Sequence, residues 1–166
     1  MHFMCPGEPN RNAVQYFAEK PFRDTTPEGE GYKRIMDNFF NTDNDKFRKQ
    51  RFKMIPQCVQ GPWLVRKAMG APAIIGKKLD TYFNRDADNT VVEVTIDVGS
   101  SMVARATLGT VSGALSGLII DLAFTIEGKK ADELPERLIG GVRVQHLNLE
   151  SHVHERDAPE HDFSKK

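Results

Sequence analysis

The segment from Thr90 to Gly128 constrains the fold most, because it joins two strand patterns through one helix pattern. Apolar and polar residues alternate over 92–98 and again over 120–126, the period of a strand with one buried face. Between them, apolar residues recur at spacings of three and four from Ala104 to Leu118, which predicts a helix. The core of the chain is therefore predicted to run strand, helix, strand.

Gly109, Gly113 and Gly117 lie at every fourth position of the predicted helix. A glycine inside a helix costs about 1 kcal/mol relative to alanine, so a close approach to another group should offset this cost. The glycines could approach one of three partners: the protein's own sheet, a ligand in an apolar cavity, or a bilayer. Asp121 and the change of period near Gly117 disfavour a membrane-spanning helix.

The composition narrows the class of protein. The chain has 166 residues, which suits one domain, and its 23 basic and 23 acidic side chains give a formal net charge of zero. Balanced charge creates no global field for nucleic acid, so we expect no nucleic-acid partner. Cys5 and Cys58 lack disulfide-framework or metal-site spacing, which predicts free thiols. No secretory signal is visible, so we expect a cytoplasmic protein, with a peripheral membrane location also open.

The other periodicities predict shorter elements around this core. We expect helices at 32–41 and 47–53 and strands at 63–68, 73–79 and 142–149. The predicted organisation is an N-terminal arm at 1–30, a folded domain at 31–149, and a polar disordered tail at 150–166. The fold class is α+β, with a curved antiparallel sheet packed on the long Gly-rich helix.

Residues that could carry chemistry are few. Ser100 and Ser101 lack the context of a nucleophile and are interpreted as the N-cap of the long helix. His152 and His154 form the closest histidine pair, but they lie in a polar tail without a supporting carboxylate or cysteine cluster, so we expect no metal site there. Asp121 lies in an apolar strand, where it could pair with an arginine, orient the polar head of a ligand, or act in catalysis. We expect no enzyme activity, no cofactor and no metal.

A basic cluster interleaves with two phenylalanines in the predicted helix at 47–53. It consists of Arg48, Lys49, Arg51 and Lys53. One interpretation is a solvated or ion-paired face, and the other is a surface for an anionic lipid headgroup or a protein partner.

Six sequence blocks resemble, in order and spacing, the C-terminal domain of the plant Enhanced Disease Resistance 2 proteins. They are residues 47–56, 61–65, 75–77, 94–101, 120–124 and 133–140. That family is associated with lipid binding and membranes, and in the plant proteins this domain follows pleckstrin-homology and START domains. This chain looks like the domain standing alone. The resemblance implies a START-like helix-grip fold.

Together, the residues and the resemblance predict a non-enzymatic domain that binds a lipid or another apolar small molecule, peripheral to membranes. Arg66 or Asp121 would meet the polar head of the ligand. The alternative is a structural or interaction subunit of a larger complex with a closed core. The predicted ligand-binding residues are Val65, Arg66, Ile74, Val92, Val94, Ile96, Val111, Leu115, Asp121, Leu122 and Phe124.

Overall fold

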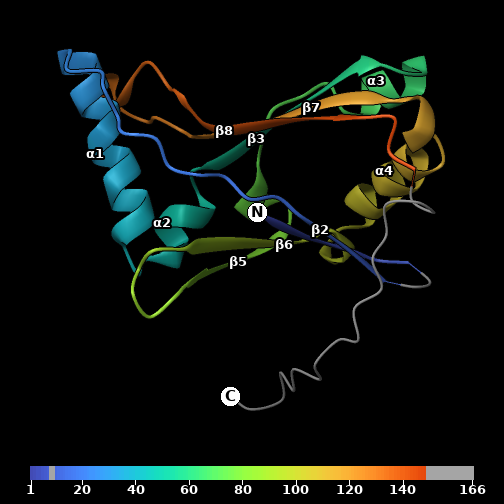
Figure 1. The fold of residues 1–166 in the computed structure, drawn as a ribbon, viewed down its shortest axis with the longest axis horizontal. Helices are drawn as coiled ribbons and strands as arrows, with labels where there is room; N and C mark the ends of the chain where they lie inside the picture. The colour runs from blue at the N-terminus through green and yellow to red at the C-terminus, as the bar shows by residue number, and fades with distance from the viewer. Residues whose placement is uncertain (8–9, 149–166) are drawn as a thin grey trace.

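The computed structural model describes residues 1–7 and 10–148, so the predicted tail at 150–166 and its histidines lie outside the described residues. Helices α1 and α2 lie at one end of the molecule and α3 and α4 at the other, with the strands between them (Figure 1). The helices are α1 (Pro27–Asn41), α2 (Asp45–Lys49), α3 (Trp63–Ala68) and α4 (Met102–Ser112). The strands are β1 (His2–Cys5), β2 (Arg11–Val14), β3 (Phe52–Gln60), β4 (Ala73–Ile74), β5 (Asp80–Arg85), β6 (Val92–Asp97), β7 (Ile119–Ile126) and β8 (Leu138–Gln145).

The described strands form two four-stranded sheets where the sequence predicted one curved sheet. Their orders are β2-β1-β6-β5 and β4-β3-β7-β8. All pairs are antiparallel except β1 with β6, which is parallel. The mixed α+β content agrees with the predicted class, but a START-like helix-grip is not confirmed. Because β1 pairs with both β2 and β6, the first residues of the chain complete a sheet.

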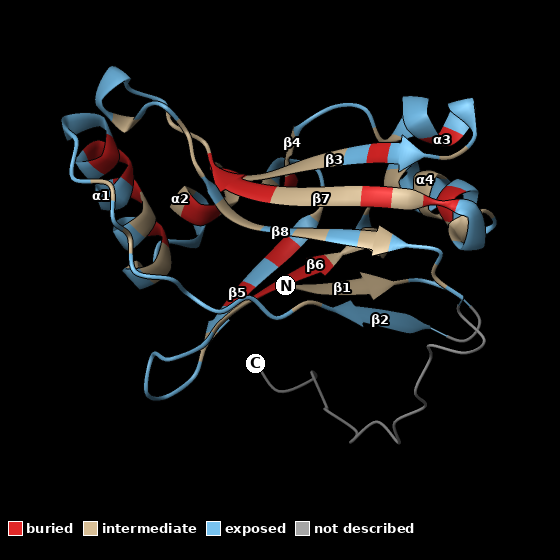
Figure 2. Ribbon diagram, turned by 45° about the horizontal axis from the view of Figure 1, so that its top comes forward, coloured by how far each residue is buried: buried red, intermediate tan, exposed pale blue. Residues whose placement is uncertain are grey.

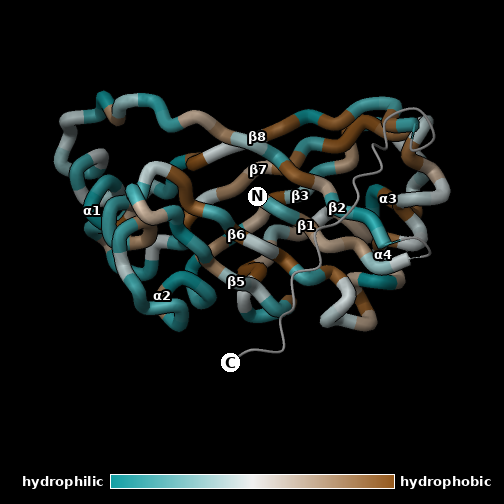
Figure 3. Tube along the Cα trace, turned by 60° about the horizontal axis from the view of Figure 1, so that its bottom comes forward, coloured by the Kyte–Doolittle hydropathy of each residue, from teal (hydrophilic) through white to brown (hydrophobic). Residues whose placement is uncertain are grey.

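The main core holds aromatic side chains from both sheets and from α1. Phe52 on β3 stacks on Phe124 on β7 with ring centroids 5.8 Å apart, and both are fully buried. Val94 and Ile96 on β6 belong to the same core. The burial pattern is visible in Figure 2, where the inward face of α1 is buried and β2 is exposed throughout. Hydrophobic residues follow the central strands, whereas α1 and α2 are mostly hydrophilic (Figure 3).

A smaller core lies at the α3 and α4 end. Val65 of α3 and Val111 of α4 pack there against Leu118 and Ile120 near the start of β7. Ile120 and Phe124 are separated by two strand periods and so share one face of β7. One face of the β4-β3-β7-β8 sheet therefore contributes to both cores.

Helix α4 begins where the sequence predicted and ends earlier. Ser101 is its N-cap, and its hydroxyl oxygen accepts a hydrogen bond from the backbone N of Ala104 at 3.4 Å. Gly113 is the C-cap, and Gly117 belongs to the 3-10 turn η3 (Leu115–Gly117). A Cβ built on Gly109 or Gly117 would meet nothing within 4 Å. In the structure these glycines adjoin open space, so the close approach that we expected from the sequence does not occur.

Several predicted boundaries were wrong. Residues 63–68 form helix α3, and the predicted strand at 73–79 is reduced to β4 followed by the 3-10 turn η1 (Ile75–Lys77). The helix predicted at 47–53 ends at Lys49, and the last strand starts at Leu138, before the predicted 142. Within α3 only Val65 is buried. Arg66, Lys67 and Ala68 are good helix formers, which accounts for the helix.

Candidate functional site

The predicted ligand-binding residues do not meet in one cavity. Val94, Ile96 and Phe124 lie in the main core, and Val65 and Val111 lie in the smaller one. The others are spread more widely. Leu122 packs against both cores, Leu115 packs against the smaller core, Ile74 and Val92 are half-buried on separate sheets, and Arg66 is exposed on α3.

Asp121 lies on the exposed face of its sheet and pairs with the neighbouring strand. Arg143 on β8, directly opposite in the register, donates to it from Nε at 2.6 Å and from Nη2 at 2.7 Å. This hydrogen bonding lowers the pKa of the Asp121 carboxyl. Asp121 thus takes the arginine-paired arrangement, with Arg143 as its partner.

The predicted basic cluster is largely engaged within the fold. The Arg51 and Glu133 side chains form an ion pair at 2.8 Å, and the Lys53 and Glu136 side chains form another at 2.7 Å. Arg48 is buried and donates from Nε to the carbonyl of Phe39 at 3.0 Å. The fourth member, Lys49, lies over the ring of Tyr82. These contacts favour the ion-paired interpretation of the cluster.

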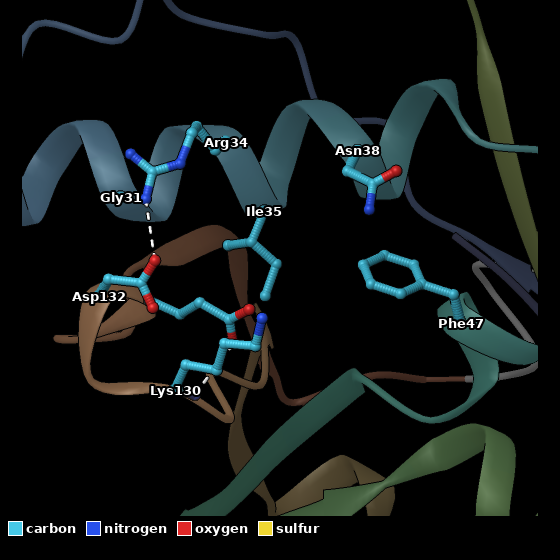
Figure 4. A pocket seen from close by; sticks show the side chains of 8 residues that line it. Gly31, Arg34, Ile35, Asn38, Phe47, Lys130 and Asp132 are labelled. Carbon is cyan, nitrogen blue, oxygen red and sulfur yellow. Dashed lines mark hydrogen bonds and ion pairs between the residues drawn. The ribbon is translucent and has the colours of Figure 1, made fainter.

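A pocket of about 210 Å³ lies between α1 and the 3-10 turn η4 (Ala131–Glu133). Figure 4 shows Ile35 and Asn38 of α1 facing it, with Phe47 opposite and Arg34 paired with Asp132 at 3.0 Å. Its remaining lining residues are Gly31, Lys130 and Glu133. Pockets that hold drug-sized ligands measure roughly 300 to 1,000 Å³, so this one is too small for a lipid.

The opposite end of the molecule exposes large apolar side chains. We call residues 61–68 and 102–117 the α3–α4 end. Trp63 is 66% exposed and Leu64 is 53% exposed on α3. Met102 and Val103, at the start of α4, are also exposed. Lys67, one helical turn after Trp63, holds its Nζ 5.7 Å from the centre of the indole ring.

The charge at the α3–α4 end is of one sign. No Asp or Glu occurs between Asp45 and Asp80, nor between Asp97 and Asp121. The end itself carries Arg66, Lys67 and Arg105. Exposed tryptophan and leucine beside cations are typical of surfaces that meet a membrane interface. In the sequence, the gaps between acidic residues are the signal of this surface.

A family model described as "Protein ENHANCED DISEASE RESISTANCE 2, C-terminal" matches residues 1–148. The chain belongs to this family. It is 38% identical over 154 residues to "Protein ENHANCED DISEASE RESISTANCE 2-like" from Arabidopsis thaliana, covering 92% of this chain and 20% of the relative. This chain therefore spans about a fifth of the length of that protein. No solved structure matches.

Two of the blocks that resemble the Enhanced Disease Resistance 2 C-terminal domain contact each other in the fold. Block 47–56 contains Arg51 and Lys53, and block 133–140 contains their partners Glu133 and Glu136. Among the residues that the structure describes, no helix is both long enough and apolar enough to cross a membrane. The two ion pairs connect the start of β3 to the loop before β8.

Proposed function

We propose that this chain is a non-enzymatic lipid-binding domain that contacts membrane surfaces with its α3–α4 end. The observation that carries the proposal is the pairing of exposed Trp63 and Leu64 with Arg66 and Lys67, in a segment without acidic residues. Indole rings favour the headgroup level of a bilayer. Each basic side chain near an anionic surface adds about 1 kcal/mol of attraction.

The binding mode differs from the cavity that the sequence suggested. Most of the predicted apolar lining residues pack against other side chains in or beside the two cores, and the proposed contact is on the outer surface of the molecule. Membership in the Enhanced Disease Resistance 2 C-terminal family is consistent with this role. A catalytic step is not part of the proposal, because the carboxylate of Asp121 is held by Arg143 on an exposed sheet face.

Sedimentation with vesicles of phosphatidylcholine and phosphatidylserine tests the proposal. The double variant Trp63→Ala/Leu64→Ala should lower the vesicle affinity about tenfold or more, because two apolar side chains no longer enter the interface. The matched control is Tyr16→Ala/Leu138→Ala, which removes an exposed aromatic and an exposed aliphatic side chain elsewhere. Equal sedimentation of both double variants, or no sedimentation of the native chain, would count against the proposal.

A second candidate function is an interaction module within a larger assembly. The observation that favours it is that the chain corresponds to 20% of its Arabidopsis relative, so this domain type also occurs next to other protein segments. Affinity purification from native extract distinguishes the two functions. A stoichiometric protein complex that forms without membranes, and that survives Trp63→Ala/Leu64→Ala, would favour the interaction module.

A further inference from the structure

We infer that the pocket between α1 and η4 binds a carboxylate that carries a small apolar body. The pocket measures about 210 Å³, the volume of about seven water molecules in the liquid. A molecule with a single ring and a carboxylate is of this size. Helices α1 and α2 lie at the end of the molecule opposite α3 and α4, so the site is separate from the proposed membrane contact (Figure 1).

Two contacts between α1 and η4 form the pocket without a ligand. Gly31 of α1 comes so close to η4 that a Cβ built there would overlap the carbonyl oxygen of Asp132. In the next turn of α1, Arg34 Nη2 donates to Asp132 Oδ2 at 3.0 Å. The backbone and a side-chain pair thus hold the two walls together. Pockets that bind small molecules are usually formed in advance in this way.

The charged side chains around the pocket leave one cation in excess. Asp132 is paired with Arg34, and Glu133 is paired with Arg51 at 2.8 Å. Lys130 also lines the pocket. In the described part of the chain, its ammonium group has no carboxylate within ion-pair distance. An anion that reached Lys130 would therefore displace no ion pair of the protein.

The remaining lining residues supply an amide and two apolar side chains. Asn38 lines the pocket from α1, and its side-chain amide makes no hydrogen bond to the described residues. Figure 4 shows this amide directed toward Phe47. Ile35, one turn earlier on α1, is 5% exposed, and Phe47 is half-buried. A flat apolar body beside Ile35 and Phe47 would shield both from water.

A carboxylate matches the unpaired polar groups of the pocket. Carboxylate oxygens only accept hydrogen bonds, whereas the Lys130 ammonium group and the Asn38 amide nitrogen donate them. Hydrogen bonds between an ammonium group and a carboxylate are stronger than those between neutral groups. A cationic ligand would be repelled by Lys130, and an uncharged one would leave it unpaired. The lining therefore selects a monocarboxylate with an apolar body.

The carboxylate could belong to a free acid or to the C-terminal residue of a peptide, and two probes distinguish these sources. 3-Phenylpropanoate has the ring and the carboxylate alone, whereas the N-acetylated tripeptide Ala-Ala-Phe carries the same groups on a peptide. NMR titration of the native chain without vesicles measures both Kd values. Tighter binding of 3-phenylpropanoate assigns the site to a free acid, and tighter binding of the tripeptide assigns it to a protein C-terminus.

Variants of exposed residues test the assigned contacts. Lys130→Gln should raise the Kd for 3-phenylpropanoate about tenfold or more, because the charge-assisted contact is lost. The uncharged 3-phenylpropanamide should bind the native chain about tenfold more weakly for the same reason. Asn38→Phe should abolish binding, because the new ring fills the pocket while Lys130 stays in place. The matched control Lys129→Gln removes an exposed charge outside the pocket and should leave the Kd within about twofold of the native value.

Three results would overturn the inference. The first is that the native chain binds neither acid probe. The second is an equal Kd for 3-phenylpropanoate and 3-phenylpropanamide. The third is an equal loss of affinity in Lys129→Gln and Lys130→Gln, which general electrostatic attraction would produce. Because the probes are used without membranes, none of these results bears on the vesicle experiment with Trp63 and Leu64.

Discussion

Arg51 and Glu133 form a nearly buried, two-contact ion pair that fastens the loop before β8 to the start of β3. Arg51 Nη1 donates to Glu133 Oε2 at 2.8 Å and Nη2 donates to Oε1 at 3.3 Å. The two side chains are 10% and 14% exposed. Glu133 also accepts from the backbone N of Lys129 at 2.6 Å. The Glu133 carboxylate thus bonds both to the backbone of its own turn and to Arg51, the residue before β3.

Replacement of Glu133 by glutamine should lower the free energy of unfolding by about 2 to 3 kcal/mol, because the Arg51 charge loses its buried partner. The matched control is Asp132→Asn, which weakens the exposed pair with Arg34 next to it in sequence. That change should cost less than about 1 kcal/mol. Urea unfolding measures both values. Equal losses in the two variants would show that the burial of the Arg51 pair contributes nothing.

The same pair predicts the acid stability of the protein. Burial alone would raise the pKa of Glu133, but hydrogen bonds from Arg51 and from the backbone N of Lys129 hold it below its ordinary value of 4.5. A carboxyl with a lowered folded-state pKa stabilises the fold above its unfolded pKa and loses that contribution as the pH falls through the folded pKa. Unfolding free energies measured from pH 7 to pH 3 should therefore decline below about 4.5. The decline should be smaller in Glu133→Gln, and parallel curves would contradict this assignment.

Two glycines in helices should respond oppositely to alanine. Gly109 in α4 faces open space, so Gly109→Ala should stabilise the protein by about 1 kcal/mol through helix propensity. Gly31 in α1 is buried, and a Cβ there would overlap the carbonyl oxygen of Asp132. Gly31→Ala should therefore destabilise by about 1 to 3 kcal/mol. Thermal unfolding compares the two variants, and a loss of stability in Gly109→Ala would indicate a packed helix face.

The strands at the centre of the chain were predictable from sequence because the alternation of apolar and polar residues is regular and continues along each strand. The start of α4 was also predictable, since Ser101 supplies a hydrogen-bonding N-cap. Helix α3 was not, because Trp63-Leu64-Val65 fits a strand as well as a helix over so few residues. Arg66, Lys67 and Ala68 favour the helix, and Val65 is the residue of α3 that it buries against the smaller core.

The ion-pair partners of the basic cluster also could not be predicted from local sequence patterns. The partners of Arg51 and Lys53 follow 82 and 83 residues later in the chain. No periodicity links such distant positions, although both belong to the blocks that carried the family resemblance. The absence of acidic residues marks the α3–α4 end in the sequence, but periodicity does not predict which of its apolar side chains are left uncovered.

Charge at the α3–α4 end should control lipid preference. Arg66→Gln/Lys67→Gln should weaken binding to phosphatidylserine vesicles by about fivefold for each charge removed. Binding to neutral vesicles should change little, and added salt should narrow the difference between the native and variant chains. Lys77→Gln/Lys78→Gln serves as the control, since these lysines lie in and beside η1, outside the α3–α4 end. If the control pair weakened vesicle binding more than Arg66→Gln/Lys67→Gln, the membrane contact would lie at η1 instead.

The fluorescence of Trp63 tests the central claim most directly, because it is the only tryptophan in the chain. In buffer its emission should be that of an exposed indole, consistent with its 66% exposure. On titration with phosphatidylserine vesicles we predict a shift of the emission to shorter wavelength and quenching by lipids brominated near the headgroup. An emission spectrum that stays unchanged and unquenched up to saturating vesicle concentrations would contradict membrane contact through the α3–α4 end.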